Sequence, residues 1–349
     1  MRLIVRRIAV ALAGFALLAS ACSGESRPDE IVLLTHDSFA MPEDVFAAFA
    51  EESGVEIRVL RGGDAGTMTS QAILTKDNPL ADVLFGIDNT FLSRALDEEI
   101  FIPYVSPGLD AVNPALVLDK EHRVTPIDFG DVCLNYDKQA FGPGLPVPDD
   151  LRDLTDPAYR GMLVVEDPAS SSPGLAFLLA TIVAFPENTA YTWKEYWADL
   201  RDNDVLVDTG WEVAYYGSFS GGSGAGDRPL VVSYASSPPA EVIFADPPLT
   251  AAPTGVITDG CFRQIEFAGI LAGTKAEGVA RELIDFMLTT RFQDEIPLSM
   301  FVFPASDLAT LPPEFVEHTV VPDNPRSIDP AAIGERRNEW IQAWTEIMR

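Results

Sequence analysis

The sequence predicts an α/β protein of two lobes, and three observations support this fold class. Roughly 320 of the 349 residues follow an N-terminal leader, which is more than one ordinary core holds, so we expect two lobes of about 100–200 residues each. Hydrophobic residues make up 47% of the chain and charged residues 22%, as in a globular protein. Short apolar runs alternate with segments of helical periodicity, and two long extended stretches bound the middle third.

The first third alternates strands with helices. Residues 31–35 form a continuous apolar run, as in a strand that is covered on both faces. Between Pro42 and Ser53 the apolar residues instead recur every three to four positions, as along one side of a helix. This alternation favours a mainly parallel sheet with helices on both faces. The expected strands are 31–35, 55–60 and 81–86, and the expected helices are 42–53, 67–76 and 91–98.

The middle of the chain repeats this pattern. Residues 217–226 are rich in glycine and serine, but they lack the Gly-Lys-Ser/Thr ending of a phosphate-binding loop. We interpret them as a flexible surface insertion. The expected strands are 162–165, 205–207 and 230–234, and the expected helices are 193–201 and an apolar one that residues 170–174 open and Ala184 ends.

Two extended stretches, 124–136 and 256–269, are the expected crossovers between the lobes. The chain would leave the first lobe through one of them, build the second lobe, and return through the other. Two amphipathic helices, 276–289 and 330–348, would then complete the first lobe. The predicted domains are 31–127 plus 262–349 for the first lobe, and 128–261 for the second.

The N-terminus has the features of an export signal. A head containing three arginines precedes the uncharged apolar run 8–18, and Ala19-Ser20-Ala21-Cys22 resembles a bacterial lipoprotein cleavage box. The alternative is an ordinary signal peptide with an incidental cysteine. The run is too short to span a bilayer permanently. We therefore predict a signal peptide over 1–21, a lipidated Cys22 with a polar tether over 22–30, and a protein anchored at the outer face of the cytoplasmic membrane.

The chain is strongly acidic, with a formal net charge of −29 that falls to −32 once the three arginines of the leader are removed. Such a charge excludes nucleic acid as a partner, because the polyanion would be repelled. It favours a small cationic ligand, although acidity also serves solubility.

The case for an enzyme is poor. The three histidines, His36, His122 and His318, stand in no metal-binding motif, and no Gly-x-Ser-x-Gly turn is present. An exported hydrolase with a dispersed Ser-His-Asp triad stays open as an alternative. We expect no catalytic residue, no metal and no cofactor.

Five short motifs, in order along the chain, carry a resemblance to a known family. The sequence resembles the thiamine-binding proteins of bacterial thiamine importers over nearly its whole mature length. The resemblance implies a type II periplasmic-binding-protein fold, with two crossover hinge strands and a ligand cleft between the lobes. It also implies a monomer that delivers thiamine, or its phosphates, to an ABC permease. The motifs are Thr35 to Phe39, Ala81 to Asn89, Asp167 to Leu175, Gly210 to Tyr215, and Ser233 to Pro238.

The resemblance also implies which residues contact the ligand. Trp211 matches a ligand-facing tryptophan, and Asp64-Ala65 matches an Asp-Gly pair. Two positions depart from the family, which commonly has Tyr where His36 stands and Trp where Phe301 stands. The remaining matches are Asp37 in the first motif, Ser171 and Ser172 for a Ser-Thr pair, and Tyr234, Ala235, Ser236 and Ser237 for a Tyr-Thr-Thr-Ser run.

These residue types also suit thiamine on physical grounds. A delocalised cation over an aromatic face gains about 0.5–2 kcal/mol per good contact, and Trp211, Tyr234 and Phe301 offer such faces. Asp64 offers a counter-charge. Ser171 and Ser172 lie where a helix begins, and the free N–H groups there favour a phosphate. The alternatives are core packing for the aromatic residues, a solvated surface position for Asp64, and simple helix capping for the serines.

Two questions stay open in the sequence. The nearest rival is a receptor of the same fold for ferric iron or a polyamine. Iron receptors typically have two adjacent tyrosines just after the strand that corresponds to 230–234, whereas the adjacent pair in this chain, Tyr215-Tyr216, precedes that strand. The fold also implies that the two crossovers run side by side. Cys133 and Cys261 lie one in each, so we predict a disulfide between them, with two buried free thiols as the alternative.

Overall fold

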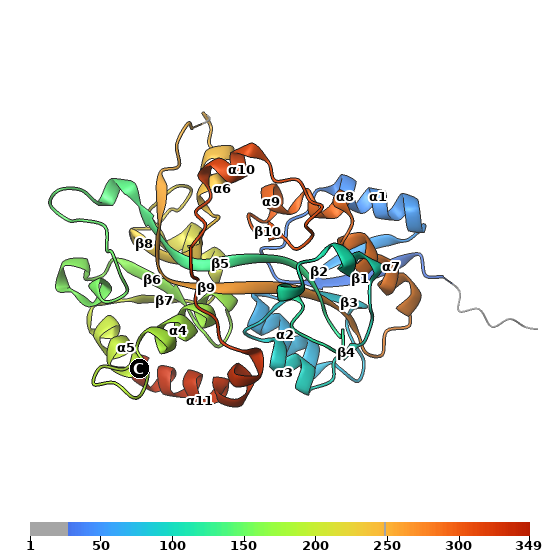
Figure 1. The fold of residues 1–349 in the computed structure, drawn as a ribbon, viewed down its shortest axis with the longest axis horizontal. Helices are drawn as coiled ribbons and strands as arrows, with labels where there is room; N and C mark the ends of the chain where they lie inside the picture. Colours follow the sequence, from blue (N-terminus) through green and yellow to red (C-terminus); the bar gives the residue numbers. More distant parts are fainter. Residues whose placement is uncertain (1–26, 248) are drawn as a thin grey trace, which may run out of the picture.

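The computed structural model describes residues 27–247 and 249–349. The predicted signal peptide, Cys22 and most of the predicted tether lie outside the described residues. The described chain forms one mixed sheet in the order β2-β1-β3-β9-β5-β8-β6-β7, with helices packed around it (Figure 1). Among the described residues no helix combines the length and apolarity needed to cross a membrane.

Two long antiparallel strands, β5 (Thr125–Asp137) and β9 (Thr254–Leu271), run through the middle of both lobes (Figure 1). They coincide with the two stretches expected as crossovers. Each is continuous across its predicted boundary, so both lobes share one sheet. At one end β9 pairs with β3, and at the other end β5 pairs with β8.

The first lobe is built on three parallel strands, with β1 between β2 and β3. Apolar side chains of β1 and β3 are fully buried, as the continuous apolar runs predict. Its strands are β1 (Glu30–Thr35), β2 (Glu56–Arg61), β3 (Val83–Asp88), β4 (Phe101–Ile102) and β10 (Phe303–Pro304). Its helices are α1 (Glu43–Ser53), α2 (Ala65–Leu74), α3 (Leu92–Asp97), α7 (Glu277–Met287), α8 (Thr290–Gln293) and α9 (Ile296–Ser299). The next helix, α10 (Pro313–His318), packs against α6 (Pro238–Ile243) of the second lobe.

The second lobe has β6 between the parallel strands β7 and β8. The predicted apolar helix is present as α4, and its side chains are buried over most of its length, which explains the lack of a polar face. The strands are β6 (Leu163–Glu166), β7 (Leu206–Asp208) and β8 (Leu230–Tyr234), and the helices are α4 (Ser172–Ala184), α5 (Trp193–Asp202) and α6 (Pro238–Ile243).

The glycine-rich segment 217–226 is folded back onto its own lobe, so the interpretation as a flexible surface insertion was wrong. Its first two residues end a π-helix (Val213–Ser218), and the residues after them pair back with this helix through backbone hydrogen bonds, among them Ala225 N to Tyr216 O at 2.9 Å. A side chain at Gly224 or Gly226 would collide with the carbonyl groups of Phe219 and Ser218. The glycines therefore permit close packing here rather than mobility.

The C-terminal helix α11 (Pro330–Met348) touches both lobes, although the predicted boundaries place it with the first (Figure 1). Trp344 meets Trp197 of α5 edge to face, with ring centroids 5.6 Å apart. The Arg337 guanidinium lies 4.5 Å from the ring centre of Phe91, next to α3.

Strand direction determines where a ligand can bind. β3 runs parallel to β5, because both are antiparallel to β9, whereas β8 runs antiparallel to β5. The carboxyl ends of the strands in the two lobes therefore point at each other across the middle of β5 and β9. Ligands of α/β sheets bind outside such carboxyl ends.

Candidate ligand-binding site

A cavity of about 400 Å³ lies between the lobes, within the range of small-molecule sites. Its walls come from the segments that follow the strands of both lobes and from the chain after α9. Of the residues predicted from the sequence, the structure brings these to the cavity wall: His36, Asp37, Asp64, Ala65, Ser172, Trp211, Tyr234, Ser237 and Phe301.

Three predicted residues do not line the cavity and are almost fully buried. Ala235 packs in one apolar cluster with Cys133 and Cys261. The Ser236 hydroxyl donates to the carbonyl oxygen of Phe301 at 2.6 Å, and so supports a wall residue from behind. Ser171 precedes α4, but its hydroxyl neither caps the helix nor has any hydrogen-bond partner among the described residues.

Trp211 is held rigidly on the wall of the second lobe. Its indole stacks on Tyr215 with centroids 5.0 Å apart and 21° between the ring planes, and Tyr216 meets it edge-on at 5.5 Å. The indole Nε1 donates to Ser233 Oγ at 2.9 Å. The π-helix that carries both tyrosines is a conformation often found at functional sites. The free face of the indole is thereby fixed before a ligand arrives.

Phe301 lines the cavity from the segment that follows α9. Its φ of 55° lies in the left-handed region, which is uncommon for a bulky residue and concentrates at functional positions. The ring meets Phe244 of the second lobe edge-on, with centroids 5.5 Å apart. Aromatic rings from both lobes thus meet at the rim of the cavity.

A chain of polar contacts forms the floor. The Tyr234 hydroxyl donates to Gln264 Oε1, and Gln264 Nε2 donates to Glu266 Oε1, each at 3.0 Å. Glu266 Oε2 lies 3.6 Å from His36 Nε2. Burial disfavours the charged imidazole, but the Glu266 carboxylate outweighs it and raises the pKa of His36. Gly86 permits this arrangement, because a side chain there would collide with the His36 ring.

Glu266 belongs to a row of three acidic residues on neighbouring strands. Asp88 on β3 and Asp128 on β5 both pair in register with Glu266 on β9. Burial raises the pKa of Asp88 to about 7, and burial together with Glu266 raises the pKa of Asp128 well above its ordinary value. The Ser172 hydroxyl donates to Asp88.

The cavity wall is acidic overall. Its carboxylates come from Asp37, Asp64, Glu212 and Glu266, whereas its basic residues are Arg61 and His36. The Arg61 guanidinium is occupied by the carbonyl oxygens of Asp37 and Phe39. Within 27–247 and 249–349, no group of three or more His, Cys, Asp or Glu side chains is arranged to hold a metal ion. Aromatic faces and carboxylates therefore suit an organic cation.

Sequence reasoning missed several wall residues, above all Glu266, Tyr215 and Phe244. Among the many acidic residues of the chain, no motif singled out Glu266. A usable signal existed, because Glu266 stands inside an apolar strand segment, where a carboxylate is costly unless it is paired or functional.

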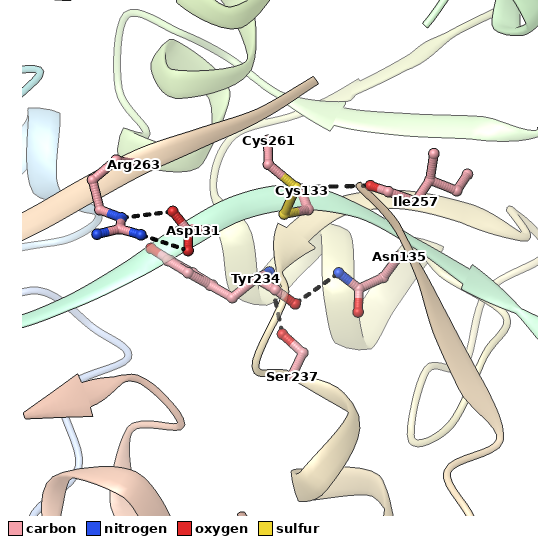
Figure 2. Close-up of a disulfide and its surroundings, with 8 residues drawn as sticks. All are labelled: Asp131, Cys133, Asn135, Tyr234, Ser237, Ile257, Cys261 and Arg263. Atoms are coloured by element: carbon pink, nitrogen blue, oxygen red, sulfur yellow. Dashed lines mark hydrogen bonds and ion pairs between the residues drawn. A yellow bond between two sulfur atoms is a disulfide. The ribbon is translucent and has the colours of Figure 1, made fainter. Parts of the chain in front are cut away.

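Cys133 and Cys261 form a disulfide between β5 and β9, with an S–S distance of 2.00 Å and Cα atoms 4.3 Å apart (Figure 2). It lies beside the ion pair of Arg263 with Asp131, whose Nε–Oδ1 distance is 2.7 Å. Tyr234 lies on the adjacent strand end, and its carbonyl oxygen accepts from Asn135 Nδ2 at 2.9 Å. The disulfide thus joins the two long strands next to a wall residue of the cavity.

Comparisons with known proteins agree with this architecture. The family model described as bacterial extracellular solute-binding protein matches residues 78–330. The thiamine-binding periplasmic protein of Salmonella typhimurium is 27% identical over 335 residues, covering 94% of this chain and 96% of the relative. Its namesake in Escherichia coli is 28% identical over 318 residues, covering 90% and 92%.

Solved structures show the same fold. A periplasmic thiamin binding protein superimposes with a TM-score of 0.81 at 25% identity, covering 93% of this chain and 98% of that one. A ferric binding protein from Campylobacter jejuni superimposes with a TM-score of 0.69 at 18% identity, covering 91% and 99%. The second likeness extends to the fold alone. The predicted type II periplasmic-binding-protein fold is confirmed, and the chain is a binding protein rather than an enzyme: it belongs to the bacterial extracellular solute-binding protein family.

Proposed function

We propose that this protein captures thiamine in the cleft between its lobes and delivers it to an ABC importer. The observation that carries the proposal is the cavity itself, whose lining combines the fixed indole of Trp211 with several carboxylates. The names of its full-length relatives support the same ligand.

Thiamine joins a flat aminopyrimidine to a thiazolium cation, and each half finds a partner of suitable chemistry here. Trp211, Tyr234 and Phe301 offer aromatic faces, on which a cation is stabilised more strongly once water is excluded. Asp37 and Glu266 can accept hydrogen bonds from the exocyclic amine or offset the positive charge.

Titration of the purified protein with thiamine, ferric iron and spermidine, followed by tryptophan fluorescence and calorimetry, tests the proposal. We expect saturable binding of thiamine alone, with quenching of Trp211. An iron receptor needs free metal ligands, but the Tyr215 hydroxyl already donates a hydrogen bond to Glu241 Oε1 at 2.7 Å. Binding of iron or spermidine in place of thiamine would contradict the proposal, and turnover of a thiamine phosphate would revive the hydrolase.

We also propose that the start of α4 receives the phosphate when a thiamine phosphate binds. Ser172 lines the cavity at the first turn of this helix, where unpaired N–H groups favour an anion. In the structure the Ser172 hydroxyl donates to Asp88, whose pKa is raised to about 7 by burial. When Asp88 is protonated, it can donate to Ser172 Oγ instead. The Ser172 hydroxyl is then free to donate to phosphate.

Replacing Ser172 by alanine should therefore weaken binding of the thiamine phosphates more than binding of thiamine. A lost hydrogen bond to a charged group costs about 1.5–3 kcal/mol. Ser171→Ala is the matched control, because its hydroxyl is buried outside the cavity, and we expect affinities for all three forms to stay unchanged. Calorimetry with thiamine, its monophosphate and its diphosphate measures the difference. An equal loss for all three in Ser172→Ala would show that this residue only supports the helix.

We further propose that the mature protein is anchored by a lipid on Cys22, on the basis of the cleavage box in the sequence. Cys22→Ser should move the protein from the membrane fraction to the soluble fraction of the producing cell. If both forms are soluble, the leader is an ordinary signal peptide. If both forms stay in the membrane fraction, an uncleaved leader holds the protein there.

A further inference from the structure

Asp64 connects the two lobes through its carboxylate. It precedes α2 in the first lobe, where Oδ1 accepts from the backbone N–H of Ala65 at 2.7 Å. Its other oxygen, Oδ2, accepts from the backbone N–H of Trp211 in the second lobe at 3.0 Å. The two partners are donors from opposite walls of the cavity. One carboxylate thus uses both oxygens to bridge the cleft.

The chain is built to let the lobes approach closely at this point. A methyl group on Gly210 would lie 2.8 Å from Asp64 Oδ2, and the three atoms nearest to it all belong to Asp64. Beside it, the backbone N–H of Gly66 donates to the carbonyl oxygen of Ser170 at 2.9 Å. A side chain on Gly66 would lie 2.7 Å from that oxygen. Small residues on both walls therefore allow direct contact between the lobes.

We propose that Asp64 is a positioning residue, which holds the closed arrangement of the lobes by binding the Trp211 backbone, rather than a counter-charge for the ligand. The indole of Trp211 does not depend on it, because Ser233 of the second lobe holds Nε1. Asp64 instead holds the first lobe against the backbone of Trp211. Its effect on ligand affinity rests on the proposed function, whereas its effect on lobe closure does not.

The chemistry of the carboxylate explains why an acid stands here. Both oxygens accept from backbone N–H groups, and a charge-assisted hydrogen bond of this kind is stronger than a neutral one. An asparagine would have one acceptor oxygen and would turn its NH₂ group toward one of the two donors. Neither alanine nor asparagine can therefore replace the bridge.

The test is a double-mutant cycle on Asp64→Ala and Gly210→Ala in the full-length protein in detergent. Pulsed electron paramagnetic resonance between spin labels on one exposed residue of each lobe measures closure, with and without thiamine, and calorimetry measures affinity. Each single variant should increase the fraction of molecules with separated lobes and weaken thiamine binding about tenfold or more. Asp64→Ala removes the bridging carboxylate, and the methyl group of Gly210→Ala pushes that carboxylate away. The double variant should be no worse than Asp64→Ala, because the added methyl group no longer meets a carboxylate.

Asp37→Ala is the comparison for charge alone. Asp37 also lines the cavity, but its Oδ1 accepts from Gly63 of its own lobe, so its loss should leave the lobe distances measured without thiamine unchanged, even if thiamine binds more weakly. The proposal is wrong if Asp64→Ala keeps the parent's distance distributions in both states, or if the two substitutions add independently. Failure of the parent protein to bind thiamine would refute the proposed function, while the distances without ligand would still decide the role of Asp64.

Discussion

Replacing both Cys133 and Cys261 by alanine is expected to lower the free energy of unfolding by up to about 4–5 kcal/mol. The two residues are 128 positions apart, so the bond closes a long loop and restricts the unfolded chain strongly. Measured losses are often smaller than the loop-entropy value, because unfolded chains retain structure. Chemical denaturation of the parent and the double variant measures the difference.

Thiamine affinity should change little in that double variant. Neither cysteine lines the cavity, and the bond joins two strands that are already paired in the sheet. Intact-mass measurement after alkylation, with and without reduction, supplies the control for the bond itself. Two thiols that are modified in the unfolded, unreduced protein would show that the chain carries no disulfide, and a double variant as stable as the parent would show that the bond contributes nothing.

The arrangement of strands could be predicted from the sequence because burial leaves a direct trace there. The apolar runs 31–35 and 230–234 correspond to β1 and β8, whose side chains are buried because both faces of the sheet are covered. The path of α11 across both lobes leaves no such trace. Its amphipathic pattern shows that one face is covered, but a pattern does not say which elements cover it.

The candidate site shows a similar limit at the level of single residues. Ser171 and Ser172 are neighbours in the predicted phosphate-binding pair, but successive side chains at a helix start point about 100° apart. Only Ser172 reaches the cavity. Ser236 is likewise one residue from Ser237, yet it turns to the Phe301 carbonyl instead. Family motifs place such segments correctly, and local backbone geometry then decides which member faces the ligand.

Trp211→Ala should weaken thiamine binding by about 1–3 kcal/mol, or roughly 5–150-fold in the dissociation constant. The substitution removes an aromatic face that is stacked on Tyr215 and fixed by Ser233, so the ligand loses a surface that needs no ordering on binding. Trp211→Phe is the matched variant, because it keeps an aromatic face while losing the indole N–H. It should recover part of the lost affinity, whereas thermal unfolding of both variants should show an intact fold. Calorimetric titration decides the matter: unchanged affinity in Trp211→Ala would mean that this residue only packs against Tyr215, and the proposed binding mode would have to be abandoned.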